Sequence, residues 1–175
     1  FVKPARGGSS IGVSKVSTWE EFPAAVDLAL EDDEKILVEP EIVGQEVEIG
    51  VLHYADGTLL ASVPALLAGI DDSDEGFYGF DTKYLDNVVT AEIPAPFAPE
   101  LTEKLRDMAI RAFEALNCEG LSRVDFFVTE DSVYINEINT LPGFTPISMY
   151  PQVLAASGVE YPALLEALIE QALAK

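Results

Sequence analysis

Basic residues are scarce in this sequence. Ten lysines and arginines stand against 31 aspartates and glutamates, which gives a formal net charge of −21. A surface this acidic repels the phosphate backbone of DNA or RNA, so we expect no nucleic-acid partner. A smaller phosphate compound could bind only where some of the few lysines and arginines lie close together, so the position of each one is informative.

Cysteine is rare and long apolar segments are missing. Cys118 is the single cysteine, so no internal disulfide can form, which favours a reducing compartment. No signal-peptide pattern is visible, nor an apolar run long enough to cross a bilayer. We therefore expect a cytoplasmic protein without a membrane partner. The chain begins without Met, on residues typical of a strand end, and we expect it to be a piece of a longer protein.

The remaining composition is that of a folded protein. The chain has 175 residues, of which 49% are hydrophobic, enough for one domain with a core or for two small lobes. Strand and helix patterns follow one another without the regular order of parallel α/β proteins, which predicts an α+β fold. The expected strands are 1–4, 12–16, 35–38, 46–54, 59–64, 122–129 and 133–139, and the expected helices are 17–30, 99–117 and two that begin near 148 and 162.

Two segments of this pattern carry conflicting signals. Ser17–Glu20 fits a capping box that would start the first helix, but Pro23 inside that helix removes one hydrogen bond and predicts a bend. Residues 65–92 hold glycines, acids and aromatics with little periodicity. A segment of this length without regular structure is typical of a lid over a site.

The segment Ala5–Gly12, within FVKPARGGSSIGVSKV, is a loop rich in glycine and serine. Glycines let backbone N–H groups converge on an anion, and Ser9 and Ser10 add hydroxyl donors. Lys3 and Arg6 place two of the ten cations beside the loop. The residues that follow are not the Lys-[Ser/Thr] pair of a P-loop, and the dinucleotide-binding pattern is absent as well. Taken alone, the loop fits an anion site and an ordinary hairpin equally well.

A stronger pattern lies in the segments SRVDFFVT and VYINEIN. If residues 130–132 form a three-residue hairpin connection, the two segments pair as antiparallel strands. In that register one face of the hairpin carries three cross-strand pairs, namely Arg123 with Asn139, Asp125 with Glu137 and Phe127 with Ile135.

The pairing of Asp125 with Glu137 has a chemical consequence. Like charges directly opposite each other destabilise a sheet, and apolar neighbours increase the cost. A divalent cation would compensate, because two carboxylates and the Asn139 amide oxygen are ligands of the kind that hold Mg²⁺ when phosphates complete its shell. The alternative interpretation is a solvated sheet face with scattered acids.

Three further segments carry weaker patterns. In residues 139–146 two prolines and a glycine fix a loop, and its N–H groups at Gly143 and Phe144 suit a developing oxyanion. In FDTKY, Lys83 is either a solvated lysine or a cation that closes onto an anion. In VEPEI, residues 38–42 follow a strand that we expect to be buried, and their backbone could read an adenine edge.

Four segments together resemble the ATP-grasp superfamily and, within it, the D-alanine–D-alanine ligase family. They are FVKPARGGSSIGVSKV, GFYGFDTKY, SRVDFF and NEINTLPGFTPISMY, and the resemblance runs in order from Phe1 to Lys175. It implies the ATP-grasp fold and a reaction in which ATP phosphorylates the carboxylate of one D-alanine. The amine of a second D-alanine then attacks the acylphosphate, in a step of peptidoglycan precursor synthesis.

The resemblance implies a division of roles around ATP. Lys3 would contact the phosphates, and the loop with Ser9 and Ser10 would close over them. The implied ATP-binding residues are Lys3, Ser10, Glu39, Ile42 and Glu46, with Glu39 and Ile42 at adenine and Glu46 at the ribose. The implied ligands of two Mg²⁺ or Mn²⁺ ions are Asp125, Glu137 and Asn139.

The resemblance also implies which residues act on the substrates. Arg123 and the N–H of Gly143 would stabilise the tetrahedral oxyanion, and Tyr84 would join Ser9 in a hydrogen-bond network. The implied catalytic set is Ser9, Tyr84, Arg123, Gly143 and Ser148, and the second D-alanine would be held by Lys83, Ser148 and Met149.

Two features depart from the family pattern. Pro40 follows Glu39 where an acid is expected, and this weakens the adenine assignment. The connection between Asp125 and Glu137 is one residue shorter than usual, which alters the turn and still leaves the two acids opposite each other.

The resemblance further implies a domain organisation. Residues 1–40 would be part of the central lobe, residues 41–175 the C-terminal lobe, and residues 69–87 a substrate loop. The N-terminal domain of the family would lie before residue 1, so this chain alone is expected to be inactive. The full-length enzyme is expected to bind only small molecules, D-alanine and ATP, and to form a homodimer.

Two other functions remain open. One is another ATP-grasp ligase that joins a carboxylate to an amine, or a D-alanine–D-lactate ligase. The pair Lys83-Tyr84 favours a D-alanine acceptor, because the D-lactate relatives carry a different residue after the lysine. The other is a non-catalytic module that binds nucleotide, or binds Ca²⁺ through Asp125 and Glu137.

Overall fold

The computed structural model describes residues 1–68, 90–145 and 147–174. The chain divides into two compact units, of which the first contains Phe1–Ile42 and the second contains Val43–Ala68 and Ala91–Lys175. The predicted division into lobes of an ATP-grasp enzyme, 1–40 and 41–175, stays a prediction. The expected loop 69–87 lies outside the described residues.

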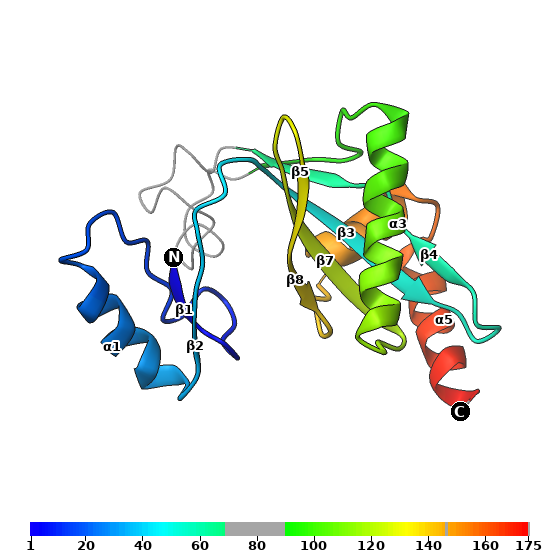
Figure 1. Cartoon of the computed structure of the whole chain (residues 1–175). Coiled ribbons are helices and arrows are strands. Elements are labelled where there is room, and N and C mark those ends of the chain that lie inside the picture. The colour runs from blue at the N-terminus through cyan, green and yellow to red at the C-terminus, as the bar shows by residue number, and fades with distance from the viewer. Residues whose placement is uncertain (69–89, 146, 175) are drawn as a thin grey trace. The chain divides into compact units, whose positions relative to one another are not determined.

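The described residues of the first unit form a two-stranded sheet and one helix (Figure 1). Strands β1 (Val2–Pro4) and β2 (Ile36–Val38) pair antiparallel. Helix α1 (Phe22–Asp32) buries Ala25 and Ala29 in a small apolar cluster with β1. The predicted strand 12–16 is reduced to a single antiparallel bridge. The strand expected to be buried is half-exposed, and its last residue is 58% exposed.

Helix α1 begins later than its sequence predicts. Glu21, rather than Glu20, accepts hydrogen bonds from the backbone N–H groups of Ser17 at 2.8 Å and Thr18 at 3.4 Å. The helix therefore starts at Phe22, and Pro23 falls within its first turn. A proline there loses nothing, because the first N–H groups of a helix have no partner within the helix. The expected bend at Pro23 was therefore wrong.

The second unit is built on a six-stranded sheet in the order β6-β5-β3-β7-β8, with β4 paired to β3. The central strand β3 is antiparallel to β4, β5 and β7, and β7 is antiparallel to β8. The strands are β3 (Gln45–His53), β4 (Leu59–Ala61), β5 (Ala65–Ala68), β6 (Thr90–Glu92), β7 (Leu121–Val128) and β8 (Val133–Asn139).

One face of this sheet carries the main core. Helix α3 (Pro99–Ala115) runs along it and buries Leu105, Ala109 and Phe113 (Figure 1). The odd-numbered residues of β3 and the even-numbered residues of β7, beginning with Val47 and Val124, fill the other side of that core. The helix predicted at 99–117 is confirmed, and it ends two residues before the predicted end.

Among the described residues of the second unit, two helices cover one end of the opposite face. Helices α4 (Met149–Ala156) and α5 (Tyr161–Leu173) form a second apolar cluster on it. A Cβ on Gly50 would collide with the Leu154 side chain, so only glycine lets α4 come this close to β3. Glu48 lies two residues before Gly50 on the same face of β3. The apolar cover of this face therefore ends between Gly50 and Glu48.

The hairpin of β7 and β8 keeps the central part of its predicted register. Asp125 pairs with Glu137 and Arg123 with Asn139, as predicted. A bulge after Asp125 shifts the rest, so Phe127 pairs with Tyr134 and not with Ile135 as predicted. The shift arises because β8 contributes one extra residue, Asn136, between the partners of Asp125 and Phe126. In the described part of the chain, no helix is both long and apolar enough to span a membrane.

Candidate active site

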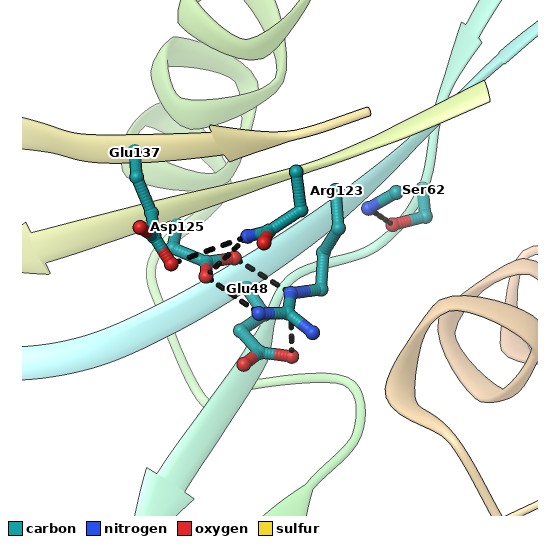
Figure 2. Close-up of polar contacts among 7 residues, drawn as sticks. Glu48, Ser62, Arg123, Asp125 and Glu137 are labelled. Carbon is teal, nitrogen blue, oxygen red and sulfur yellow. Dashed lines mark hydrogen bonds and ion pairs between the residues drawn. The ribbon is translucent and has the colours of Figure 1, made fainter. Parts of the chain in front are cut away.

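A guanidinium surrounded by carboxylates lies on the partly covered face of the sheet, and Figure 2 shows its contacts. Arg123 donates from Nε to Asp125 Oδ1 and from Nη2 to Asp125 Oδ2, both at 2.7 Å. Its Nε also lies 3.2 Å from Oε2 of Glu48. Alternation along β7 puts Arg123 and Asp125 on one face, and the register of β3 places Glu48 beside Asp125.

The electrostatics of this cluster are dominated by its burial. The side chains of Arg123 and Asp125 are 17% and 16% exposed, and that of Glu48 is 4% exposed. Burial alone would lower the pKa of Arg123, but the hydrogen bonds and charge of Asp125, with the charges of Glu48 and Glu137, raise it. Three carboxylates act on one guanidinium, so the cluster keeps an excess of negative charge.

The three residues predicted to bind metal lie together at this cluster. The Asn139 amide Nδ2 donates to Oδ2 of Asp125 at 3.0 Å and lies 3.4 Å from Oε1 of Glu137. One oxygen of each acid therefore points to a common position. The structure also adds a compensation that the sequence argument lacked, because Arg123 already neutralises part of the charge of Asp125.

These residues fit a hard divalent cation. The two converging carboxylates supply oxygen ligands, and Asn139 supplies a third if its Oδ1 replaces Nδ2 at the common position. Among the described residues, no group of three or more His, Cys, Asp and Glu side chains could hold a metal ion, so the two carboxylates alone are too few. Other ligands, such as phosphate oxygens, would have to complete the shell.

The loop after β8 brings two further predicted residues into contact. A Cβ on Gly143 would lie 2.9 Å from Oγ of Ser148, so the two residues are adjacent. Ser148 Oγ accepts a hydrogen bond from the N–H of Thr145 at 3.1 Å and lies 2.8 Å from the Thr145 hydroxyl. Ser148 is the N-cap residue of α4, and Met149 is its first helical residue.

Two of the predicted ATP-binding residues of the first unit, Lys3 and Glu39, contact each other. Lys3 Nζ lies 2.8 Å from Oε2 of Glu39, so the lysine assigned to phosphate and the acid assigned to adenine form an ion pair. Arg6 is committed to Asp33 in a two-point contact at 2.5 and 2.9 Å, which holds the pKa of Asp33 well below its usual range. Arg6 therefore fixes the base of the glycine-rich loop to the end of α1.

The glycine-rich loop has an unusual backbone at its predicted site residues. Ser9 and Ser10 have φ of 52° and 58°, a left-handed conformation that non-glycine residues seldom adopt. Each such residue costs about 1–2 kcal/mol, and such strain is found preferentially at functional sites. This observation supports a role for the loop beyond that of a simple turn.

The remaining predicted residues are placed less closely. Glu46 lies on β3, two residues before Glu48, and pairs with Phe127 of β7. Ile42 ends the first segment of the first unit. Lys83 and Tyr84 lie outside the described residues.

Residues 1–170 match the sequence model of the family described as D-ala D-ala ligase C-terminus. The chain belongs to the D-alanine–D-alanine ligase family. The D-alanine–D-alanine ligase of Corynebacterium efficiens is 66% identical over 173 residues, which cover 99% of this chain and 48% of that protein. The chain thus spans about half the length of the curated relatives it matches.

Solved structures of this family have the same fold. The D-alanine–D-alanine ligase of Coxiella burnetii matches 99% of this chain and 44% of its own at a TM-score of 0.84 and 38% identity. The VanG D-Ala:D-Ser ligase of Enterococcus faecalis matches 98% of this chain and 48% of its own, at a TM-score of 0.83 and 34% identity. The Bacillus anthracis D-alanine–D-alanine ligase complexed with ATP matches 98% of this chain and 51% of its own, at a TM-score of 0.78 and 26% identity. The predicted α+β class, the ATP-grasp fold and the family are therefore confirmed.

Glu48 is the residue of this cluster that sequence reasoning missed. The strand expected at 46–54 places Val47, Ile49 and Val51 on one face and a second stripe on the opposite face. That stripe reads Glu46, Glu48 and Gly50, and two acids followed by glycine are unusual in a strand at the centre of a sheet. The signal was therefore present, but the pairing of β3 with β7 was needed to place Glu48 beside Asp125.

Asp125 and Glu137 are expected to differ in their contribution to stability without metal. Asp125→Ala removes the partner of a partly buried Arg123 and should lower the free energy of unfolding by about 1.5–3 kcal/mol. Glu137→Ala, at an exposed position, should change it by no more than about 0.5 kcal/mol. Urea unfolding in EDTA measures both. A variant Asp125→Ala as stable as wild type would show that repulsion between the acids outweighs the pairing with Arg123.

Gly143→Ala is expected to destabilise the loop through Ser148. The new Cβ would lie 2.9 Å from Ser148 Oγ, and relieving this contact should cost about 1–3 kcal/mol. In a Ser148→Ala background the oxygen is absent, so the same substitution should cost clearly less. Thermal unfolding of the two single variants and the double variant gives the coupling. Equal costs in both backgrounds would contradict the contact.

Proposed function

We propose that the protein is an ATP-dependent D-alanine–D-alanine ligase and that this chain carries its ATP, metal and second-substrate residues. The observation that carries the proposal is the family match over residues 1–170, which includes the cluster of Arg123, Asp125, Glu137 and Asn139. The 66% identity to a ligase named for this activity supports it.

The residues of the first unit would hold ATP. Lys3 would leave Glu39 in part to contact the phosphates, and Glu39 and Ile42 would lie at adenine. The strained backbone at Ser9 and Ser10 would present N–H and hydroxyl donors to the phosphates. Glu46, from β3, would accept a hydrogen bond from the ribose. The ATP complex of the B. anthracis enzyme supports ATP as the nucleotide.

The acidic cluster would hold the metal and the reacting carboxylate. Asp125, Glu137 and Asn139 would bind two Mg²⁺ or Mn²⁺ ions. When bound, the ions would neutralise the negative charge of the phosphate groups that react. Arg123 would lie at the edge of this cluster and stabilise negative charge that develops on the substrate.

The loop after β8 would position the second D-alanine. The N–H of Gly143 would donate to the developing oxyanion, together with Arg123. Ser148 and Met149, at the start of α4, would bind the substrate carboxylate with Lys83, and Tyr84 would connect to Ser9. The net reaction forms a dipeptide and converts ATP to ADP and phosphate.

The acceptor needs an argument of its own, since a relative of similar fold is named for a different acceptor. VanG of E. faecalis is named a D-Ala:D-Ser ligase and is 34% identical. The pair Lys83-Tyr84 and the higher identity to the Corynebacterium ligase favour D-alanine over D-serine or D-lactate. We further propose a cytoplasmic homodimer that acts in peptidoglycan precursor synthesis.

The experiment uses the protein at the full length that its gene encodes. With D-alanine, ATP and Mg²⁺ it should release ADP and phosphate and form D-alanyl-D-alanine, which mass spectrometry identifies. D-lactate or D-serine offered with D-alanine should give much less mixed product. Binding of ATP without any ligation product would support the non-catalytic alternative. If the mixed product exceeded the dipeptide, the acceptor would be D-serine or D-lactate and not D-alanine.

A further inference from the structure

Glu48 is one of two buried carboxylate residues among the described residues, the other being Asp33. It is 3% exposed and stands on β3 between Val47 and Ile49, which both belong to the apolar core. A buried carboxylate is costly unless a cation pairs with it. An apolar or hydroxyl side chain would suit this strand position as well, so the strand structure alone does not explain the carboxylate of Glu48.

The partner of Glu48 is Arg123. Oε2 of Glu48 lies 3.2 Å from Nε of Arg123, and the charge of Glu48 is among the influences that raise the pKa of that guanidinium. The register explains the geometry. Glu48 pairs with Asp125, and Arg123 pairs with Gly50. The guanidinium is thus held from two neighbouring strands.

The two carboxylates around Arg123 differ in what else they must do. In the proposed function Asp125 gives oxygens to a metal ion, although both of its oxygens accept hydrogen bonds from Arg123 in this structure. A cation at Asp125 weakens that two-point contact, because both positive groups compete for the same oxygens. Glu48 is not among the proposed metal ligands and can keep its contact to Nε.

We propose that Glu48 is a positioning residue that holds the Arg123 guanidinium in place while Asp125 binds metal. The role rests on the proposed function, since it is defined by what Arg123 does to the reacting substrate. Glu48 itself touches no reacting atom. Among the described contacts, its loss would leave Arg123 with Asp125 alone, and Arg123 would then compete with the metal ion for that carboxylate.

The test compares Glu48→Gln with wild type in the full-length enzyme. Glu48→Gln keeps the shape of the side chain and removes its charge, so kcat for dipeptide formation should fall about 10- to 100-fold. KM for ATP should change less than about threefold, because Glu48 is not assigned to the nucleotide. Mn²⁺ affinity, measured by electron paramagnetic resonance, should not fall.

Two comparisons separate positioning from a merely structural role. In an Arg123→Ala background, Glu48→Gln should lower kcat by less than about twofold further, because the residue through which it acts is gone. Glu103→Gln is the matched control. It removes the carboxylate of another Arg–Glu pair, with Arg106 at 2.8 Å on the exposed side of α3, and kcat should stay at the wild-type value.

If Glu48→Gln does not fold, Glu48→Asp is the second variant. It keeps the charge but withdraws it by one methylene, and a reduced kcat with wild-type thermal unfolding would support positioning. A wild-type kcat in whichever of the two variants folds would overturn the role of Glu48 while the ligase assignment stands. The same is true of equal losses in the presence and absence of Arg123. If the wild-type enzyme forms no dipeptide, the proposed function fails and this role fails with it.

Discussion

The contact between Arg123 and Asp125 is the interaction on which the site depends. Two hydrogen bonds of 2.7 Å hold the guanidinium of Arg123 to the carboxylate of Asp125 on β7. Without it, Asp125 would face both Glu48 and Glu137 with no protein cation among these contacts. With it, the charge of the cluster is reduced but stays negative, which is a suitable state for attracting a divalent cation and a phosphate compound together.

The sheet makes this cluster possible because its two faces differ. One face is mainly apolar and carries α3 over the main core of the second unit. The other face is covered by α4 at Gly50. Two residues earlier on the same strand, at Glu48, this face is charged. The charged groups therefore lie on a rigid sheet, partly buried beside an apolar cluster. Such surroundings strengthen their mutual interactions relative to water.

The fold and the central pair could be predicted from the sequence because they depend on local alternation. The positions of Asp125 and Glu137 follow from period-two patterns and a short turn, and the structure places them opposite each other. The bulge after Asp125 and the neutralising role of Arg123 could not be predicted in this way. The bulge depends on how the turn closes, and an arginine two residues from an acid can turn to either strand. Glu48 required the pairing of two strands separated by more than sixty residues, which no local pattern encodes.

The central claim is that the acids on β7 and β8 bind metal while Glu48 retains Arg123. A crystal structure of the full-length protein with Mn²⁺ and a non-hydrolysable ATP analogue tests it most directly. We predict anomalous density for Mn²⁺ within coordination distance of Asp125, Glu137 and Asn139, with Arg123 still in contact with Glu48. Manganese bound elsewhere, or Arg123 released from Glu48 in that complex, would contradict the account.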